Sequence, residues 1–422
     1  MKYVVTRIHK IVLLLFLTAG ILLVSACSSN SEVDFAQKYK VDVSGAADIS
    51  QKLQQAINEL PAGGTLYLQD GVYPLSTTLA LKGDMTLKLS DNAVLLNQSS
   101  ETDPTMVLNH PLKHDKAEGG SNIIIEGGIW DMNGRLDADG NPINLPGMRS
   151  VHGLALGYAN NVTIRNVTFR DCYNGHVFQF AAMDQVLVEN CRFEGQSFRG
   201  SGNKTTELIQ IEPGSLKGYP YTLVQDKKPT TNVTIRGCYF GGSEAAPQYM
   251  VAIGTHSQQA GVKCSDILIE DCTFDSAVLA AIHFMAYDRT TIRNNTFHMV
   301  EADAAEIFDR YGILADTYGA MIDPKGADGT TELVIEGNTF TMDAPGVTGI
   351  TVTGNNGSPK KPSDILIKNN TITGQNGAVG IELYRVEDCT LEGNTIQGFQ
   401  TAVSAGKSEG EVYSDVDIVY TE

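Results

Sequence analysis

The sequence is poor in aromatic and basic side chains, and its only long apolar run ends at residue 24. Aromatic residues make up 7% of the chain, and tryptophan occurs once. Lysine and arginine total 31 against 49 aspartates and glutamates, so the formal net charge is −18. This charge argues against a nucleic-acid partner, because phosphate backbones are bound by basic surfaces. A local basic cleft for an anionic polysaccharide stays possible.

Recognisable metal-binding patterns are scarce as well. No Cys-x-x-Cys spacing occurs, and Asp-rich calcium loops of the EF-hand or nonapeptide type are absent. We therefore expect no metal site and no cofactor. The segment Leu136-Asp-Ala-Asp-Gly-Asn141 carries oxygen ligands at alternate positions. It is more typical of a polar hairpin turn, although it could hold Ca²⁺.

The N-terminus has the features of an export signal. A positively charged start is followed by the apolar run 11–24 and then by Val24-Ser-Ala-Cys27. This ending resembles the lipobox of bacterial lipoproteins, which implies that Cys27 is lipidated and becomes the mature N-terminus. We thus expect a signal peptide over 1–26, a polar tether over 27–41, and an exported protein held to the cell membrane by lipid. An ordinary cleaved signal is the alternative.

One eight-residue pattern recurs through the rest of the chain. It alternates apolar residues, continues with a polar pair and ends in a Thr-Phe-like step, as in Val162-Thr-Ile-Arg-Asn-Val-Thr-Phe169. Some copies lie 24 residues apart (193−169 and 396−372), which is the length of one β-helix coil, and longer spacings add an insertion to one turn. The last residues of the copies are Phe169, Phe193, Phe240, Phe274, Phe297, Phe340, Ile372 and Ile396.

Alternation with a period of two predicts short strands with one buried face. One coil cannot bury its apolar edge alone, so the coils must stack around a shared core. The spacing of apolar residues over 48–60 predicts a helix, which Pro61-Ala-Gly-Gly64 ends. This helix would cover the first coil, because an open end exposes strand edges. The predicted fold is all-β, a single-domain right-handed parallel β-helix (solenoid) over 42–422 with an N-terminal capping helix.

Asparagine or cysteine recurs at one step of the pattern. Stacked asparagines can hydrogen-bond along the axis of stacked strands. Cysteines at the same step favour buried free thiols over disulfides, although an even number of cysteines remains after Cys27. The residues at this step are Cys191, Cys238, Cys272, Asn295, Asn338, Asn370 and Asn394, and Cys389 falls on an inward apolar step.

The beginning of the first coil, from Gly63 to Tyr73, resembles pectin-lyase-fold proteins, especially glycoside hydrolase family 28. The segment from Gly127 to Gly134 is similar to a Gly-x-Ile-Asp-Gly-x-Gly turn of that family. The resemblance implies the fold and activity on carbohydrate. It carries over little chemistry: Glu207 aligns with the first catalytic carboxylate, but Gln248-Tyr249 stands for the Asp-Asp pair and Ala280 for the histidine.

Aligning the coils predicts a polar face on consecutive strands. We expect the residues at the strand starts to point outward at a bend. With insertions 194–230, 241–264 and 298–330 as walls, this face would form a substrate cleft. The candidate catalytic residues are Glu207, His176, His256 and Glu212. The candidate substrate-binding residues are Gln179, Gln210, Tyr249, His283, Tyr287, Asp288 and Arg289.

Three functions fit this face. The leading hypothesis is a glycoside hydrolase acting on a polysaccharide or glycan, although Glu207 and Glu212 would be about 16 Å apart on one strand, beyond the ~5–9.5 Å that such enzymes use. A polysaccharide lyase or epimerase would use His176 and Tyr249 on a uronic acid, with an arginine such as Arg289 neutralising its carboxylate. The third hypothesis is a non-catalytic, glycan-binding or adhesive surface protein.

Overall fold

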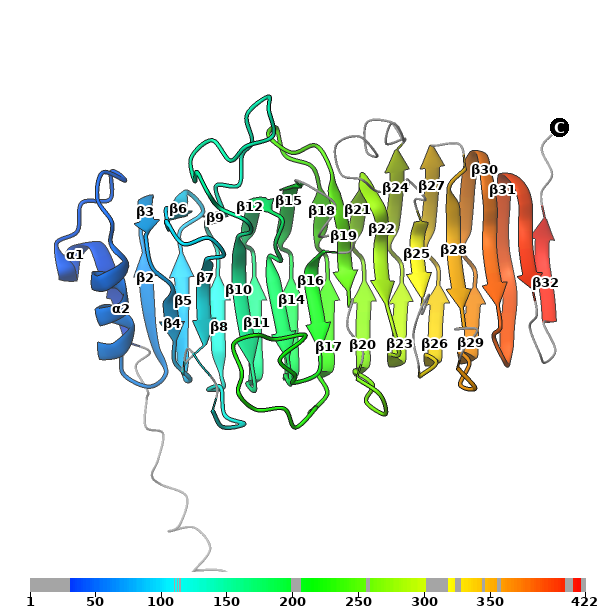
Figure 1. The fold of residues 1–422 in the computed structure, drawn as a ribbon, viewed down its shortest axis with the longest axis horizontal. Helices are drawn as coiled ribbons and strands as arrows, with labels where there is room; N and C mark the ends of the chain where they lie inside the picture. Colours follow the sequence, from blue (N-terminus) through cyan, green and yellow to red (C-terminus); the bar gives the residue numbers. More distant parts are fainter. Residues whose placement is uncertain are drawn as a thin grey trace, which may run out of the picture.

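The structure is a computed structural model that describes residues 31–109, 111, 113, 115–198, 206–255, 259–300, 318–322, 328–343, 346–354, 358–406 and 413–418. Its strands wind into stacked coils that form three long parallel sheets (Figure 1). Each named strand pairs in parallel with the equivalent strand of the next coil. We call these sheets A, B and C, in the order in which each coil visits them. The predicted parallel β-helix is confirmed.

Sheet A holds β1 (Glu32–Asp34), β2 (Gly64–Leu68), β5 (Met85–Leu89), β8 (Ile123–Glu126), β11 (Asn160–Arg165), β14 (Asp184–Glu189), β17 (Thr231–Arg236), β20 (Ser265–Glu270), β23 (Asp288–Arg293), β26 (Thr331–Glu336), β29 (Ser363–Lys368) and β32 (Tyr413–Ile418). Sheet B holds β3 (Gly71–Leu75), β6 (Ala93–Asn97), β9 (Ile129–Asp131), β12 (Thr168–Tyr173), β15 (Arg192–Ser197), β18 (Tyr239–Gly241), β21 (Thr273–Asp275), β24 (Thr296–Val300) and β27 (Thr339–Asp343).

Sheet C holds β4 (Leu79–Leu81), β7 (Thr105–Asn109), β10 (His152–Gly157), β13 (Phe178–Ala181), β16 (Glu207–Glu212), β19 (Tyr249–Gly254), β22 (Ala277–Phe284), β25 (Tyr318–Ile322) and β28 (Thr348–Thr353). Two long strands turn the corner between sheets without a break, namely β30 (Thr371–Tyr384) and β31 (Cys389–Gly406).

The recurring step residues form ladders inside the coils. The phenylalanine rings from Phe169 to Phe340 stack in sequence, with centroid distances from 4.2 to 5.5 Å. In the asparagine ladder, Asn338 Nδ2 donates to Asn370 Oδ1 at 2.9 Å and to the Ile292 carbonyl at 3.0 Å. The six cysteines from Cys172 to Cys389 are buried and free, as the repeat predicts. Burial raises the pKa of Cys172 to about 12, so its thiol stays protonated at neutral pH.

The outer face of sheet A carries a row of alternating charge. Each basic side chain pairs with the acidic side chain of the preceding coil, at 2.6 Å for Arg165 with Glu126 and 2.7 Å for Arg236 with Glu189. Such a row favours one strand register, because a slip would separate the paired charges. Its members are Glu126, Arg165, Glu189, Arg236, Glu270, Arg293, Glu336, Lys368 and Glu392.

The N-terminal end is capped by α2 (Ser50–Glu59), where the sequence predicts a helix (Figure 1). Leu53 and Ile57 are fully buried against the first coil. The boundary at residue 42 is wrong, since β1 and α1 (Phe35–Tyr39) already belong to the folded body. The strand β1 pairs with β2, and Phe35 is fully buried in the main core cluster, so this segment packs on the first coil.

Candidate functional site

His176 and Glu207 occupy equivalent positions where the chain enters sheet C, shortly before β13 and at the beginning of β16. His176 precedes Phe178 by two residues, as Glu207 precedes Ile209, and Phe178 pairs with Ile209. The following positions, Val177 and Leu208, belong to the main core cluster. Val251, which pairs with Glu207, packs instead with Phe198, Met250 and Val278 in a separate cluster. The row containing Glu207 and Val251 therefore points away from the interior.

Two histidines lie side by side in this row. The His152 and His176 rings are 5.6 Å apart, and the His176 backbone N–H donates to His152 Nδ1 at 3.2 Å. His176 Nδ1 lies 2.6 Å from the Glu207 carbonyl oxygen and 3.8 Å from Glu207 Oε2. Because a carbonyl only accepts, Nδ1 of His176 must carry a proton. Burial lowers the pKa of His152 to about 4, against a smaller opposite effect of Asp103.

The register predicted for β19 is wrong by two residues. Val251, and not Tyr249, pairs with Glu207, and Gly254 follows Gln210 in the next coil where Ala252 is expected. Apolar residues alternate along this strand, so a slip of two keeps the inward face inward and is invisible to a hydrophobic pattern. Tyr249 is fully buried within the main core cluster, which removes it from the predicted face.

The other polar side chains of the face bind one another. Gln179 Nε2 donates to Gln210 Oε1 at 3.0 Å, and Gln210 Nε2 donates to Glu212 Oε1 at 3.2 Å. The Thr255 hydroxyl also donates to Glu212 Oε1. Glu207 and Glu212 are both 0% exposed. The structure thus brings His176, Gln179, Glu207, Gln210 and Glu212 onto neighbouring strands as buried groups.

The loop 213–230 covers part of this face, where the sequence leads us to expect a cleft wall. The Tyr219 side chain packs on Leu108, Ala155 and Ala181, which belong to the neighbouring strands β7, β10 and β13. Gly157 leaves room for it, since a Cβ there would lie 2.6 Å from the Tyr219 ring. Burial raises the pKa of Tyr219 well above its usual value. The insertion covers this part of the face because Tyr219 and Tyr221 pack on these apolar side chains.

The remaining candidates lie at the other edge of sheet C or beyond it. Tyr287 is buried, and its hydroxyl donates to the Ile211 carbonyl at 2.9 Å. Asp288 and Arg289 begin β23 in sheet A, where Arg289 also pairs with Asp266 at 2.7 Å. Asp288 and Arg289 thus lie on another sheet than Glu207, whereas Tyr287 lies near enough to Glu212 and Glu207 for their charges to add to the effect of burial in raising its pKa. His283 pairs with Gly254 and is buried, while His256 and Cys27 lie outside the described residues.

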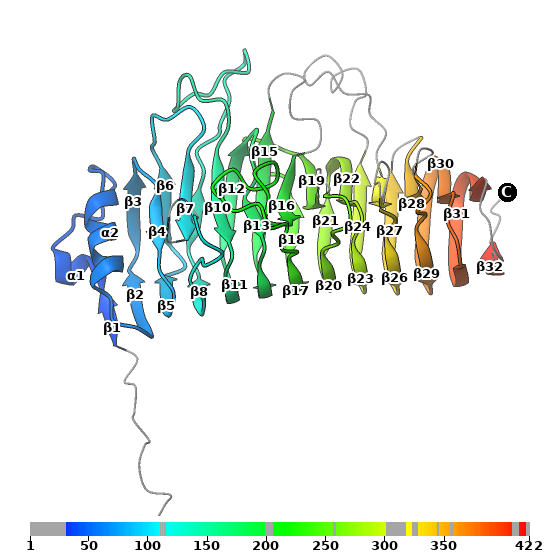
Figure 2. The ribbon, with the colours of Figure 1, turned by 60° about the horizontal axis from the view of Figure 1, so that its bottom comes forward.

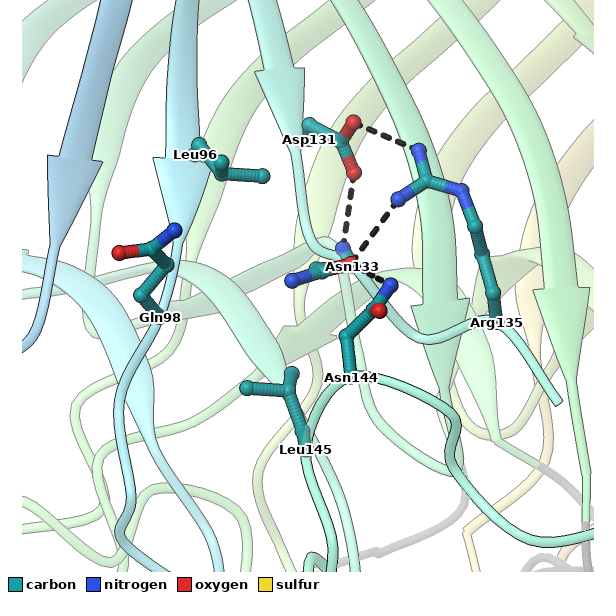
Figure 3. Close-up of a pocket in the computed structure, with 7 residues that line it drawn as sticks. All are labelled: Leu96, Gln98, Asp131, Asn133, Arg135, Asn144 and Leu145. Atoms are coloured by element: carbon teal, nitrogen blue, oxygen red, sulfur yellow. Dashed lines mark hydrogen bonds and ion pairs between the residues drawn. The ribbon is translucent and has the colours of Figure 1, made fainter. Parts of the chain in front are cut away.

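An open pocket of about 600 Å³ lies elsewhere, beside sheet B (Figure 3). It is built by the ends of β6 and β9 and by the loop 132–149, which stands out from the body in Figure 2. None of the residues predicted from the sequence as site residues lines it. The available signal was the alternation Asp131-x-Asn133-x-Arg135 directly after a strand. The lining residues are Leu96, Gln98, Asp131, Asn133, Arg135, Asn144 and Leu145.

Arg135 organises the polar side of this pocket. Its guanidinium contacts Asp131 Oδ2 at 2.6 Å and Asp171 Oδ2 at 2.8 Å, and it donates to Asn133 Oδ1 at 2.9 Å. Arg170 reaches Asp131 from the next coil at 2.9 Å. Burial acts to lower the pKa of Arg135, but the hydrogen bond and the charges of Asp131 and Asp171 outweigh it and raise that pKa.

The hairpin at the tip of this loop forms as predicted. Asp137 Oδ1 accepts hydrogen bonds from the backbone N–H groups of Asp139 and Asn141, at 3.0 and 2.8 Å. Among the described residues, no group of three His, Cys, Asp or Glu side chains is placed to hold a metal ion. A His-x-x-x-His spacing at His110 and His114 falls outside that part of the chain. No helix in the described ranges is long and apolar enough to cross a membrane.

Comparison with known proteins connects the chain to a bacterial surface protein. Residues 147–315 match the family model described as the right handed beta helix region. Over 389 residues the chain is 33% identical to the plasmin and fibronectin-binding protein A of Streptococcus pneumoniae, covering 87% of this chain and 54% of that protein. The chain therefore spans about half the length of this curated relative.

Solved structures agree with this likeness. A structure of the Streptococcus pneumoniae surface protein and adhesin PfbA superposes with a TM-score of 0.79 at 29% identity, covering 93% of this chain and 99% of that one. The A-module of mannuronan C-5 epimerase AlgE4 from Azotobacter vinelandii gives 0.58 at 17% identity, over 90% and 100% of the two chains. The second likeness shows the fold alone. By the matched model and these neighbours, the chain is a right-handed parallel β-helix protein.

Proposed function

We propose that this chain is a non-catalytic surface adhesin whose β-helix binds extracellular proteins. The observation that carries the proposal is its 33% identity, over 87% of its length, to a protein named for binding plasmin and fibronectin. Fibronectin and plasmin are therefore the first partners to test. A stacked solenoid suits this role, because it offers a long rigid surface on which loops from successive coils lie side by side.

The buried carboxylates of sheet C also favour adhesion over hydrolysis. A glycosidase needs one carboxyl group to protonate the leaving oxygen and a second to activate water or attack the sugar. Glu207 and Glu212 are fully buried, and Glu212 accepts hydrogen bonds from Gln210 and Thr255. Neither of these carboxylates is placed to meet a polymer at the surface. This burial speaks against the hydrolase hypothesis, which needs such a pair, and the burial of Tyr249 in the core speaks against the lyase hypothesis, which needs Tyr249 beside His176.

Binding to immobilised fibronectin and plasmin tests the proposal. We expect saturable binding by the folded chain, which is lost after thermal unfolding. The same preparation is incubated with neutral and uronic polysaccharides, and new reducing ends and unsaturated uronate are measured. Absence of binding to both proteins at about 10 µM, a weak affinity for a specific complex, would overturn the proposal. Polysaccharide cleavage that Glu207→Gln abolishes would overturn its non-catalytic part.

We also propose that the protein is exported and held at the cell surface through lipid on Cys27. Surface location agrees with the similarity to a surface adhesin, and the anchor rests on the sequence Val24-Ser-Ala-Cys27. Metabolic labelling with a fatty-acid analogue should mark the wild-type chain and not Cys27→Ser. Equal labelling of the two chains would exclude this anchor.

A further inference from the structure

The pocket beside sheet B has the size and polarity of a small-ligand site. Ligand pockets in proteins commonly measure about 300–1,000 Å³ and combine apolar surface with a few fixed polar groups. This one measures about 600 Å³. Figure 3 shows Leu96, Gln98 and Leu145 on one side, facing Asp131, Asn133 and Arg135 on the other. Asn144 lies between them in Figure 3. Three separate stretches of chain, 96–98, 131–135 and 144–145, line the space.

The charges around the pocket cancel. Asp131 and Asp171 are both nearly buried, and each contacts a guanidinium of Arg135 at 2.6 or 2.8 Å. Arg170 supplies the second positive charge by binding Asp131 at 2.9 Å. The two carboxylates and the two guanidinium groups therefore leave no net charge to attract an ion. A ligand of either sign would gain little Coulomb energy here, which favours a neutral one.

The hydrogen-bonding network fixes the polar wall and leaves amide groups for a ligand. Asn133 Oδ1 accepts from Arg135 at 2.9 Å and from Asn144 Nδ2 at 2.7 Å, and Asn133 Nδ2 donates to the Asn97 carbonyl at 3.0 Å. Within the described part of the chain, no hydrogen bond occupies Asn144 Oδ1 or the side-chain amide of Gln98. These amides offer both donors and acceptors, while Leu96 and Leu145 offer apolar surface.

We propose that this pocket binds a neutral sugar residue of a glycan. Sugar hydroxyls both donate and accept hydrogen bonds, so they match side-chain amides better than a lone charged group does. The C–H face of the ring would lie against the two leucines. The binding needs no reaction and no metal. It goes beyond the proposed adhesion to proteins, and either activity can fail without the other.

The proposal is tested by titrating the full chain with neutral oligosaccharides and with their uronic-acid counterparts, using calorimetry or ligand-observed NMR. We expect a neutral member to bind at least tenfold more tightly than its uronic counterpart. The double variant Gln98→Ala/Asn144→Ala should weaken that binding by about tenfold, because it removes neutral hydrogen bonds. Both side chains are exposed and outside the core, so the variant should fold. The matched control is Gln225→Ala, an exposed glutamine on the loop 213–230.

Three results would overturn the sugar site. They are absence of binding by every oligosaccharide at millimolar concentration, preference for the uronic form, and equal affinity of the double variant and the wild-type chain. A double variant that loses the sugar but keeps fibronectin and plasmin supports a separate site. If the wild-type chain binds sugar but binds neither fibronectin nor plasmin, only the adhesin proposal is contradicted.

Discussion

His152 shows how burial at the entrance to sheet C fixes a protonation state. Its Nδ1 accepts a hydrogen bond from the His176 backbone N–H at 3.2 Å, and its Nε2 lies 3.3 Å from the Ser150 hydroxyl. Protonating Nδ1 would break the first contact. Burial also disfavours the charged ring and lowers its pKa to about 4 from 6.5. The native state therefore holds this imidazole neutral where the unfolded chain would charge it.

This residue should make stability depend on pH. Between about pH 6.5 and pH 4 the unfolded chain binds a proton that the native chain does not, so the free energy of unfolding falls as the pH falls. The contribution of His152 should be on the order of 2 kcal/mol. Chemical denaturation at pH 7 and pH 4.5 measures it. In His152→Gln the difference between the two pH values should shrink; an unchanged difference would assign the slope to other groups.

At the scale of elements, the asparagine ladder ties one coil to the next. Asn338 Nδ2 donates to the Ile292 carbonyl and to Asn370 Oδ1, and Asn338 Oδ1 accepts from the Asn295 backbone at 2.9 Å. Asn338→Ala would remove the acceptor of the buried Asn295 N–H and the side-chain donor to the Ile292 carbonyl, while Asn370 Oδ1 keeps the Asn338 backbone N–H. Each buried group that loses its partner costs about 1–3 kcal/mol. We expect a total loss of roughly 3 kcal/mol in unfolding free energy, measured by urea denaturation.

The neighbouring position provides the control for this ladder. Thr339 is exposed, so Thr339→Ala should change the unfolding free energy by less than about 0.5 kcal/mol. If Asn338→Ala were as mild as Thr339→Ala, the ladder would be a consequence of stacking and not a source of stability.

The sequence predicts the regular elements of this fold, but it does not predict how an irregular turn shifts the pairing of the strand that follows. The step residues, the coils and α2 follow from local periodicity, which each coil repeats. The register predicted for β19 is wrong because Tyr249, Val251 and Ile253 follow one another at every second position, so each could take the inward place. The pairing with β22 also shifts between Tyr249 and Val251. Repeats report which face is buried, but they do not number the residues in an irregular turn.

The burial of the candidate site is a property of the tertiary structure, which local patterns do not report. Glu207, Gln210 and Glu212 do lie on one strand beside His176 and Gln179, as the aligned coils indicate. Distant segments contribute to the burial of Glu212: a Cβ at Gly218 would lie 2.9 Å from its Oε2, and the Thr255 hydroxyl donates to its Oε1. The pocket at Arg135 depends likewise on Asp171 from the next coil. No periodicity reports where a loop returns to the body.

At the scale of the whole molecule, the stack behaves as a line of units that contact only their neighbours. Its N-terminal end is closed by α2, whose side chains pair with the open edge of the first coil. Gln54 Oε1 accepts from the Ala80 N–H at 2.7 Å, and Gln54 Nε2 donates to the Ala80 carbonyl at 3.1 Å. The Ser50 hydroxyl accepts from the Ser76 N–H at 2.9 Å. The helix thus supplies the partners that a further coil would otherwise provide.

Weakening this cap should unfold the stack locally, from one end. Leu53 is fully buried, and Leu53→Ala removes about 2–5 kcal/mol of packing at that site. Because coils interact only with neighbours, the loss should appear in β2 to β7 and fade along the axis. Hydrogen exchange followed by mass spectrometry measures this gradient, with exposed Lys52→Ala as the control. Equal loss of protection in β2 and β26 would show that the chain instead unfolds as one cooperative unit, whose stability is shared among all coils.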